Sequence, residues 1–125
     1  MQEDLIKESF MKHEMKLHRD PFEKIKQGTK TIELRLYDEK RRAISVGDEI
    51  EFTSRALGER LICRVIALHI FDSFEDLYRE LPLLRCGYTE QDISTAAPSD
   101  MDAYYSREQQ SAYGVVGIEI EVINV

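Results

Sequence analysis

The stretch of residues 61–71, in the middle of the chain, places the strongest constraint on the fold. Every residue in this stretch except Arg64 and His69 is apolar. A short run that is apolar on both faces is typical of a strand buried inside a sheet, because a strand with one wet face alternates apolar and polar side chains. We therefore predict that residues 61–71 form a long central strand.

Four other segments alternate apolar and polar residues with the period of two that predicts a strand. They are residues 13–19, 31–36, 49–54 and 114–125. In the second of these, Thr31, Glu33 and Arg35 alternate with three apolar side chains. This pattern predicts a half-buried strand on which the three polar residues share one face.

Capping residues mark the predicted helices. Asp20 is placed to cap a helix, Pro21 is suited to its first position and Gly28 to a left-handed stop. Ser73 is predicted to cap a second helix in the same way. Residues 37–45 are predicted to form a turn or short helix, and two capping boxes predict short helices over residues 89–94 and 99–110.

The order of these elements predicts the fold class. Strands outnumber the helices between them, so a doubly wound parallel sheet is disfavoured. We expect an α+β protein, with a mixed sheet or small β-barrel and short helices at its periphery.

The chain of 125 residues contains no repeat, proline-rich linker or low-complexity segment. This predicts one domain over residues 13–125, preceded by a polar lead-in of residues 1–12. No apolar run approaches the ~18 residues that span a bilayer, and no signal peptide is recognisable, so we expect no membrane partner. Cys63 and Cys86 form no disulfide framework, which favours a reduced cytoplasmic location.

The net charge of −7 is unevenly distributed along the chain. Residues 12–42 hold ten Lys and Arg against six Asp and Glu, a net charge of +4, whereas residues 43–125 hold six against fifteen, a net charge of −9. An anionic partner is therefore expected to contact only the first third of the chain. This favours a small or short ligand over a long DNA duplex.

The densest polar feature is the block of residues 28–35, which contains Lys30, Glu33 and Arg35. Lys30 lies at the bend behind Gly28 and can turn toward the face that carries Glu33. A lysine and a carboxylate at such a site suit general acid and base catalysis if burial lowers the lysine pKa. The alternative is a solvated strand face with an ion pair worth under ~1 kcal/mol.

Two further features suit a nucleic-acid ligand. Lys40, Arg41 and Arg42 match phosphate oxygens, although a charged turn has the same composition. Tyr105 and its neighbour Tyr104 suit stacking on bases, although a tyrosine on a short helix also fills a core. The three histidines lack the spacing of metal ligands, and no cofactor-binding glycine motif is present, so neither a metal nor a cofactor is expected.

The block Gly-x-Lys-x-x-Glu-x-Arg at residues 28–35 is followed by Val46-Gly47-Asp48 and a hydrophobic strand, and Tyr113-Gly114-Val115-Val116-Gly117-Ile118 lies near the end. In these motifs the chain resembles the ASCH domain family, over roughly residues 13–123. The resemblance implies a PUA-like β-barrel. It also implies a cleft beside the barrel that binds RNA or nucleotides, with Lys30, Glu33 and Arg35 lining it and residues 40–42 at its rim.

One branch of the family resembles small amidohydrolases that act on acetylated cytidine, and other members resemble ribonucleases. The amidohydrolases use a lysine, a threonine three positions later and a more distant glutamate. Here Lys30 matches, but Glu33 stands where the threonine is expected, so this activity does not follow from the resemblance.

Three hypotheses follow for function. The first is an RNA- or nucleotide-binding domain that uses the basic cleft, with Lys30, Glu33, Arg35, Tyr105 and residues 40–42 as ligand contacts. The second is a hydrolase acting on a modified nucleoside or on RNA, with Lys30 as base or nucleophile and Glu33 as its acid partner. The third is an interaction domain that uses the acidic surface of the remainder of the chain. The first is favoured by the basic first third, and no oligomeric state is implied.

Overall fold

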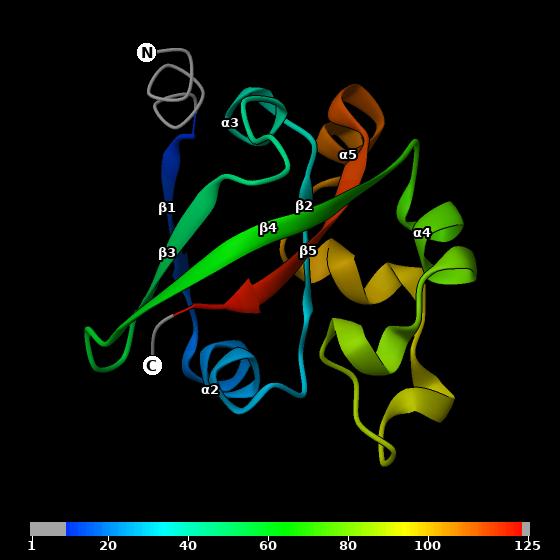
Figure 1. Cartoon of the computed structure of the whole chain (residues 1–125). Coiled ribbons are helices and arrows are strands. Elements are labelled where there is room, and N and C mark those ends of the chain that lie inside the picture. Colours follow the sequence, from blue (N-terminus) through cyan, green and yellow to red (C-terminus); the bar gives the residue numbers. More distant parts are fainter. Residues whose placement is uncertain (1–9, 124–125) are drawn as a thin grey trace.

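A computed structural model describes residues 10–123 of the chain. It contains one mixed sheet of five strands in the order β1-β3-β4-β5-β2 (Figure 1). The strands are β1 (Lys12–Leu17), β2 (Ile32–Leu36), β3 (Glu49–Ser54), β4 (Arg60–Phe71) and β5 (Val115–Val122). β1 runs parallel to β3, and every other neighbouring pair is antiparallel. The sheet forms a half-barrel with short helices around it, which confirms the predicted α+β class and the PUA-like architecture.

The long apolar strand is confirmed as the centre of the sheet, because β4 pairs with both β3 and β5. Its Cys63 is fully buried, and burial raises the pKa of this thiol to about 12. The first nine residues of the predicted lead-in lie outside the described part of the chain. Lys12, the last residue assigned to that lead-in, already belongs to β1.

The sheet separates two hydrophobic cores. The core inside the half-barrel includes Phe22, Ile50 and Phe52. The second core lies on the outer side of β2 and β5 and includes Phe74 and Leu77 of α4 (Phe74–Glu80). Two cores on opposite faces leave β2 and the first half of β5 with no wet face. None of the helices among residues 10–123 is long and apolar enough to cross a membrane.

The prediction that residues 31–36 form a half-buried strand is wrong, because β2 is covered on both faces. Ile32 and Leu34 belong to the outer core. Glu33 pairs with Ile118, an inner-core residue, so both side chains point to the inside of the half-barrel. The curvature of the sheet encloses the polar face of β2, and only 4% of Glu33 is exposed.

The helix α2 (Arg19–Gln27) begins earlier than predicted. Its N-cap is His18 rather than Asp20, and no side chain caps its first turn. Pro21 is still tolerated there, because the amide groups of the first turn have no partner within the helix. Gly28 ends the helix with a φ of 86°, which confirms the predicted left-handed stop.

The segment between α4 and β5 differs most from the sequence-based expectation. It consists of three short 3₁₀ helices, η1 (Leu83–Cys86), η2 (Ile93–Thr95) and η3 (Pro98–Ala103), followed by α5 (Arg107–Tyr113). The predicted helix over residues 99–110 is interrupted, since Ser106 starts α5 with a new capping box. In residues 89–94 the Asp92 carboxylate accepts hydrogen bonds from the backbone N–H and hydroxyl of Thr89, which closes a turn instead of a helix.

Gly117 allows the outer core to pack directly on β5. A Cβ atom at this position would lie 2.7 Å from Leu81 Cδ1 and 3.1 Å from Ile32 Cγ2. We therefore expect Gly117→Ala to lower the free energy of unfolding by about 1–3 kcal/mol through overpacking. Urea denaturation measures this loss. It should shrink when the substitution is made in a Leu81→Ala background, and equal losses in the two backgrounds would contradict the contact.

Candidate functional site

A cleft of about 670 Å³ opens where β1 and β2, the two edge strands of the half-barrel, face each other without pairing. One wall comes from β1, α2 and the end of β3. The other comes from the segment between α4 and α5. The cationic residues that line the cleft are Lys16, Lys24, Lys30, Arg35 and Arg55. The tyrosines are Tyr78, Tyr88, Tyr104 and Tyr105, and the carboxylates are Asp20, Glu33, Asp92 and Asp100.

A three-residue ionic group lies at the centre of this cleft. Lys30 Nζ lies 2.8 Å from Glu33 Oε1, and Arg35 Nε lies 2.6 Å from Glu33 Oε2. The exposed fractions of the three side chains are 11%, 6% and 14%. The sequence-based alternative of a solvated ion pair is therefore wrong, because all three charges are largely withdrawn from water.

Burial and ion pairing act in opposite directions on Glu33. Burial raises the pKa of its carboxyl, but the positive charges of Lys30 and Arg35 outweigh that effect and hold the pKa below its usual value. Glu33 in turn raises the pKa of Arg35 against the opposing effect of burial. The group therefore carries two cations and one carboxylate, with a net charge of +1.

Backbone geometry behind Gly28 positions Lys30. The amides of Thr29 and Lys30 both donate to the carbonyl of Lys24, which closes the end of α2. The amide of Thr31 then donates to the carbonyl of Arg85, so η1 is attached to the start of β2. The Lys30 side chain passes Gly87, where a Cβ would lie 3.4 Å from its Cδ.

Arg35 and Lys24 connect the two sides of the cleft. Arg35 Nη2 donates to the carbonyl of Lys16 over 3.1 Å, and this bond crosses from β2 to β1. Lys24 Nζ donates to the carbonyl of Gly87 over 2.8 Å, from α2 to the opposite wall. The first contact joins the two edge strands and the second joins the two walls of the cleft, and neither closes the sheet.

Of the residues predicted as ligand contacts, the structure brings four together and separates three. Lys30, Glu33, Arg35 and Tyr105 all line the cleft, whereas residues 40–42 do not. Tyr105 also packs in the outer core, where its ring stacks on Phe74 at 6.3 Å. Burial raises the pKa of Tyr105, and the charge of Arg35 opposes the shift.

The three basic residues belong to or flank the short helix α3 (Glu39–Arg42). Arg41 Nη1 lies 3.1 Å from Asp38 Oδ2 and is held in an ion pair at the start of the helix. The guanidinium of Arg42 lies 4.3 Å above the ring of Tyr37 and donates to the carbonyl of Tyr113. These contacts hold Arg41 and Arg42 beside α3, and neither side chain lines the cleft.

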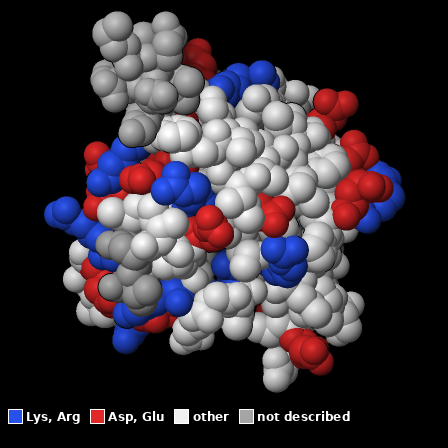
Figure 2. Space-filling view, viewed as in Figure 1, with Lys and Arg blue, Asp and Glu red and all other residues white. Residues whose placement is uncertain are grey.

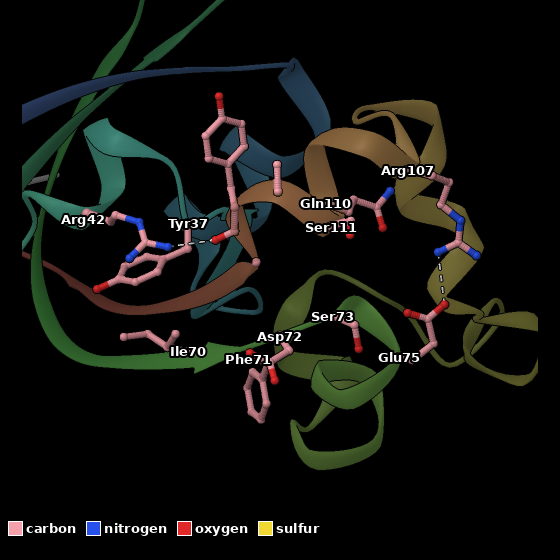
Figure 3. A pocket seen from close by; sticks show the side chains of 13 residues that line it. Tyr37, Arg42, Ile70, Phe71, Asp72, Ser73, Glu75, Arg107, Gln110 and Ser111 are labelled. Atoms are coloured by element: carbon pink, nitrogen blue, oxygen red, sulfur yellow. Dashed lines mark hydrogen bonds and ion pairs between the residues drawn. The ribbon is translucent and has the colours of Figure 1, made fainter.

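Arg42 instead lines a second cavity of about 650 Å³, between α5 and the turn from β4 to α4. Figure 3 shows Arg42 and Tyr37 at one end of this cavity and the ion pair of Arg107 and Glu75 at the other. Ile70 lies along its floor. The guanidinium groups at both ends already have partners within the chain.

Sequence patterns did not reveal most of the cleft. No sequence pattern connects Tyr78 with Tyr88 or with Lys16. Arg55 follows the end of β3 and carries no motif. Lys24 lies on the predicted helix that ends at Gly28, and no motif indicated that it lines a site.

The net charge of the cleft is less positive than the net charge of residues 12–42. Five Lys and Arg side chains line it against four Asp and Glu side chains, a net charge of +1. On the face seen in Figure 2, basic and acidic side chains are interspersed, and no single basic surface is visible there. Positive charge is therefore limited to particular side chains of the cleft.

Neither metal nor thiolate chemistry is evident in the cleft. Within residues 10–123 no group of three or more His, Cys, Asp or Glu side chains is arranged to hold a metal ion. Cys86 lines the cleft, but burial raises the pKa of its thiol to about 11. The Lys30–Glu33–Arg35 group is thus the main candidate for chemistry.

The buried group predicts a large effect of Glu33→Gln. The substitution leaves Lys30 and Arg35 buried without their counter-charge, so we expect a loss of about 3–5 kcal/mol in the free energy of unfolding. Denaturation in guanidinium chloride measures this loss of stability. Glu59→Gln breaks the exposed pair with Lys26 and serves as the matched control, with almost no expected effect.

The same group predicts a pH dependence. Because the pKa of Glu33 is lowered by folding, its contribution is present above the unfolded glutamate pKa of about 4.3 and is lost as the pH falls through the folded-state value. Wild-type stability should therefore fall more steeply with acid than that of Glu33→Gln. Parallel stability curves below pH 5 would contradict the low pKa.

Solved structures with the same fold support this description. The hypothetical protein PH0355 is 36% identical, with 90% of this chain and 100% of that chain covered and a TM-score of 0.75. Protein PF0455 from Pyrococcus furiosus is also 36% identical, with 92% and 100% covered and a TM-score of 0.72. A variant of ZmASCH from Zymomonas mobilis shares the fold at 12% identity, with 89% and 70% covered and a TM-score of 0.62. No curated protein matches the chain.

The family comparison agrees with the fold and with the motif at the cleft. Residues 15–124 match the ASCH domain, a span that contains β2, the second half of β1 and every residue that lines the cleft. The chain therefore belongs to the ASCH domain family.

Proposed function

We propose that this protein binds single-stranded RNA or a nucleotide in the cleft between β1 and β2. The observation that carries the proposal is the Lys30–Glu33–Arg35 group, whose net positive charge lies at the centre of a cleft large enough for a nucleotide. Maintaining two cations in a largely buried position is costly unless they are paired, and here one carboxylate is shared between them. Such a site favours an anionic or acceptor-rich ligand.

The side chains around this group suit the two parts of a nucleotide. Tyr104 is 66% exposed and lines the cleft beside the more buried Tyr105, so a base has an aromatic surface on which to stack. Lys16 and Arg55 lie on the opposite wall, and both are exposed. They are suited to phosphate oxygens, which are bound through charge and directional N–H donors.

The acidic remainder of the chain limits the length of RNA that is bound. The cleft has a net charge of only +1, and residues 43–125 carry −9. A short single strand or a mononucleotide is therefore the proposed ligand. Arg41 is near enough to Tyr105 to affect the pKa of its hydroxyl, so residues 40–42 are proposed to contact a strand that extends past Tyr105.

Binding of a fluorescein-labelled, mixed-sequence RNA of eight nucleotides tests the proposal. We expect affinity to fall as salt rises, and Arg55→Ala to reduce the slope of log K against log salt by about 0.7 for one lost phosphate contact. Lys26→Ala is the matched control, since this exposed residue pairs with Glu59 and does not line the cleft.

Fluorescence anisotropy at 50 to 200 mM salt measures both quantities. Affinity that does not change with salt would contradict the role of phosphate. Equal slopes for Arg55→Ala and Lys26→Ala would place the contact elsewhere on the molecule.

The direct contact of Lys30 with Glu33 favours a second candidate function, hydrolysis of an acetylated nucleoside. The low pKa of Glu33 keeps its carboxyl ionised, so it fits a proton acceptor better than the acid partner expected from the sequence. Lys30, 2.8 Å away, is then placed to donate a proton or to stabilise an oxyanion.

Incubation with N4-acetylcytidine tests this second function through the release of acetate. If the pair is catalytic, Lys30→Ala should slow release by about 100-fold or more, while Lys26→Ala leaves it unchanged. Absence of turnover in the wild type, or turnover retained in Lys30→Ala, would exclude the pair as catalytic and leave binding as the function.

A further inference from the structure

A chain of hydrogen bonds runs along the wall of the cleft that faces the cationic side chains. Tyr78 Oη lies 2.6 Å from Tyr88 Oη, and Tyr88 Oη lies 2.6 Å from Asp100 Oδ2. All three residues line the cleft, although they come from α4, from the turn after η1 and from η3. These two hydrogen bonds therefore bring together groups that are well separated in the sequence.

The direction of these hydrogen bonds is determined by Asp100. A carboxylate only accepts, so the single hydroxyl proton of Tyr88 is donated to Asp100. Tyr88 then has no proton for Tyr78, and the hydroxyl of Tyr78 must donate to Tyr88. Burial and these bonds raise the pKa of Tyr88 far above its usual value, so its hydroxyl stays protonated.

This arrangement leaves an unoccupied hydrogen-bond acceptor on a residue that lines the cleft. Asp100 Oδ2 receives the Tyr88 hydroxyl and also the backbone N–H of Ala97, which occupies both of its lone pairs. Within residues 10–123 no hydrogen bond reaches Oδ1 of the same carboxylate. Asp100 is exposed in the cleft, so Oδ1 is free to accept from a ligand.

The two walls of the cleft are thus complementary to different chemical groups of one ligand. The wall with Lys16 and Arg55 offers donors and positive charge, which suits a phosphate. On the wall with Tyr78, Tyr88 and Asp100, both tyrosine hydroxyls already donate within the wall. The group that remains available is an acceptor, Asp100 Oδ1, which suits a base edge with N–H groups. A nucleotide that carries adjacent N–H donors on its base matches both.

We propose that the cleft prefers guanine nucleotides and that Asp100 Oδ1 is the residue atom that recognises the base. Among the four bases, guanine alone presents two adjacent N–H groups, at N1 and N2, on its Watson–Crick edge. The two lone pairs of Oδ1 accept both. Tyr88 acts as a positioning residue, because its hydroxyl holds the other oxygen of the carboxylate. This inference rests on the proposed binding function and names its ligand class.

Inosine monophosphate separates this recognition from general nucleotide binding, since it is guanosine monophosphate without the N2 amino group. We expect the wild type to bind 5′-GMP about tenfold more tightly than 5′-IMP. In Asp100→Asn, the amide oxygen is retained by Tyr88 and Ala97, so an NH₂ donor replaces Oδ1 in the cleft. The preference for GMP over IMP should then disappear, while stability is little changed.

Three further variants check the geometry. Tyr88→Phe should reduce the GMP preference without abolishing nucleotide binding, because Asp100 loses the donor that holds it. Tyr78→Phe should retain the preference, since Tyr88 still donates to Asp100. Asp102→Asn is the matched control on the same helix η3, because Asp102 bonds Gln110 and does not line the cleft.

Isothermal titration with GMP, IMP, AMP, CMP and UMP measures these preferences, and an eight-nucleotide RNA is compared with its inosine-substituted form. Equal affinity for the guanine and inosine ligands in the wild type overturns guanine recognition while leaving the proposed binding function intact. A preference that survives in Asp100→Asn overturns the role of Asp100. Absence of binding to every nucleotide and to both RNAs would overturn the proposed function itself, and with it this inference.

Discussion

The ion pairs of Glu33 are the interaction on which the cleft depends. One buried carboxylate holds Lys30 and Arg35 at 2.8 and 2.6 Å, and each of these cations reaches a different part of the molecule. Arg35 bonds the carbonyl of Lys16 on β1, and Lys30 packs against Gly87 on the opposite wall. Because both cations are largely buried, removal of the shared carboxylate affects stability and the shape of the cleft together.

The ion pairs of Glu33 lie at the place where the sheet of the half-barrel does not close. β1 and β2 are the edge strands and do not pair with each other (Figure 1). The side chain of Arg35 instead bonds the carbonyl of Lys16 on β1. A closed barrel would fill its interior with apolar side chains. Here the interior is apolar around Phe52, and the ionic group of Glu33 lies at the open edge. The cleft is the place where the inner core meets water, and its chemistry follows from that position.

The fold is conserved much further than the sequence in the structures that resemble this one. The ZmASCH variant keeps the fold at 12% identity, so the architecture tolerates nearly complete replacement of side chains. Function then depends on which residues reach the cleft from outside the block of residues 28–35. In this chain those residues include Tyr78, Tyr88 and Asp100, which form a hydrogen-bonded wall opposite the cationic one. We expect ligand preference within the family to vary with this wall.

The sequence by itself determined the features that arise from local chain geometry. Alternation located four of the strands, the apolar run of residues 61–71 located the fifth, and Gly28 ended α2. The spacing of Lys30 and Glu33 placed a cation and a carboxylate at one bend. Only the tertiary structure decided that the polar face of β2 is buried, because burial depends on how the sheet curves and on the distant segments that pack around that face. It also decided that residues 40–42 line no part of the cleft, while Asp100, seventy residues beyond Lys30, does. A local pattern specifies which side chains share a face, but long-range packing specifies what that face meets.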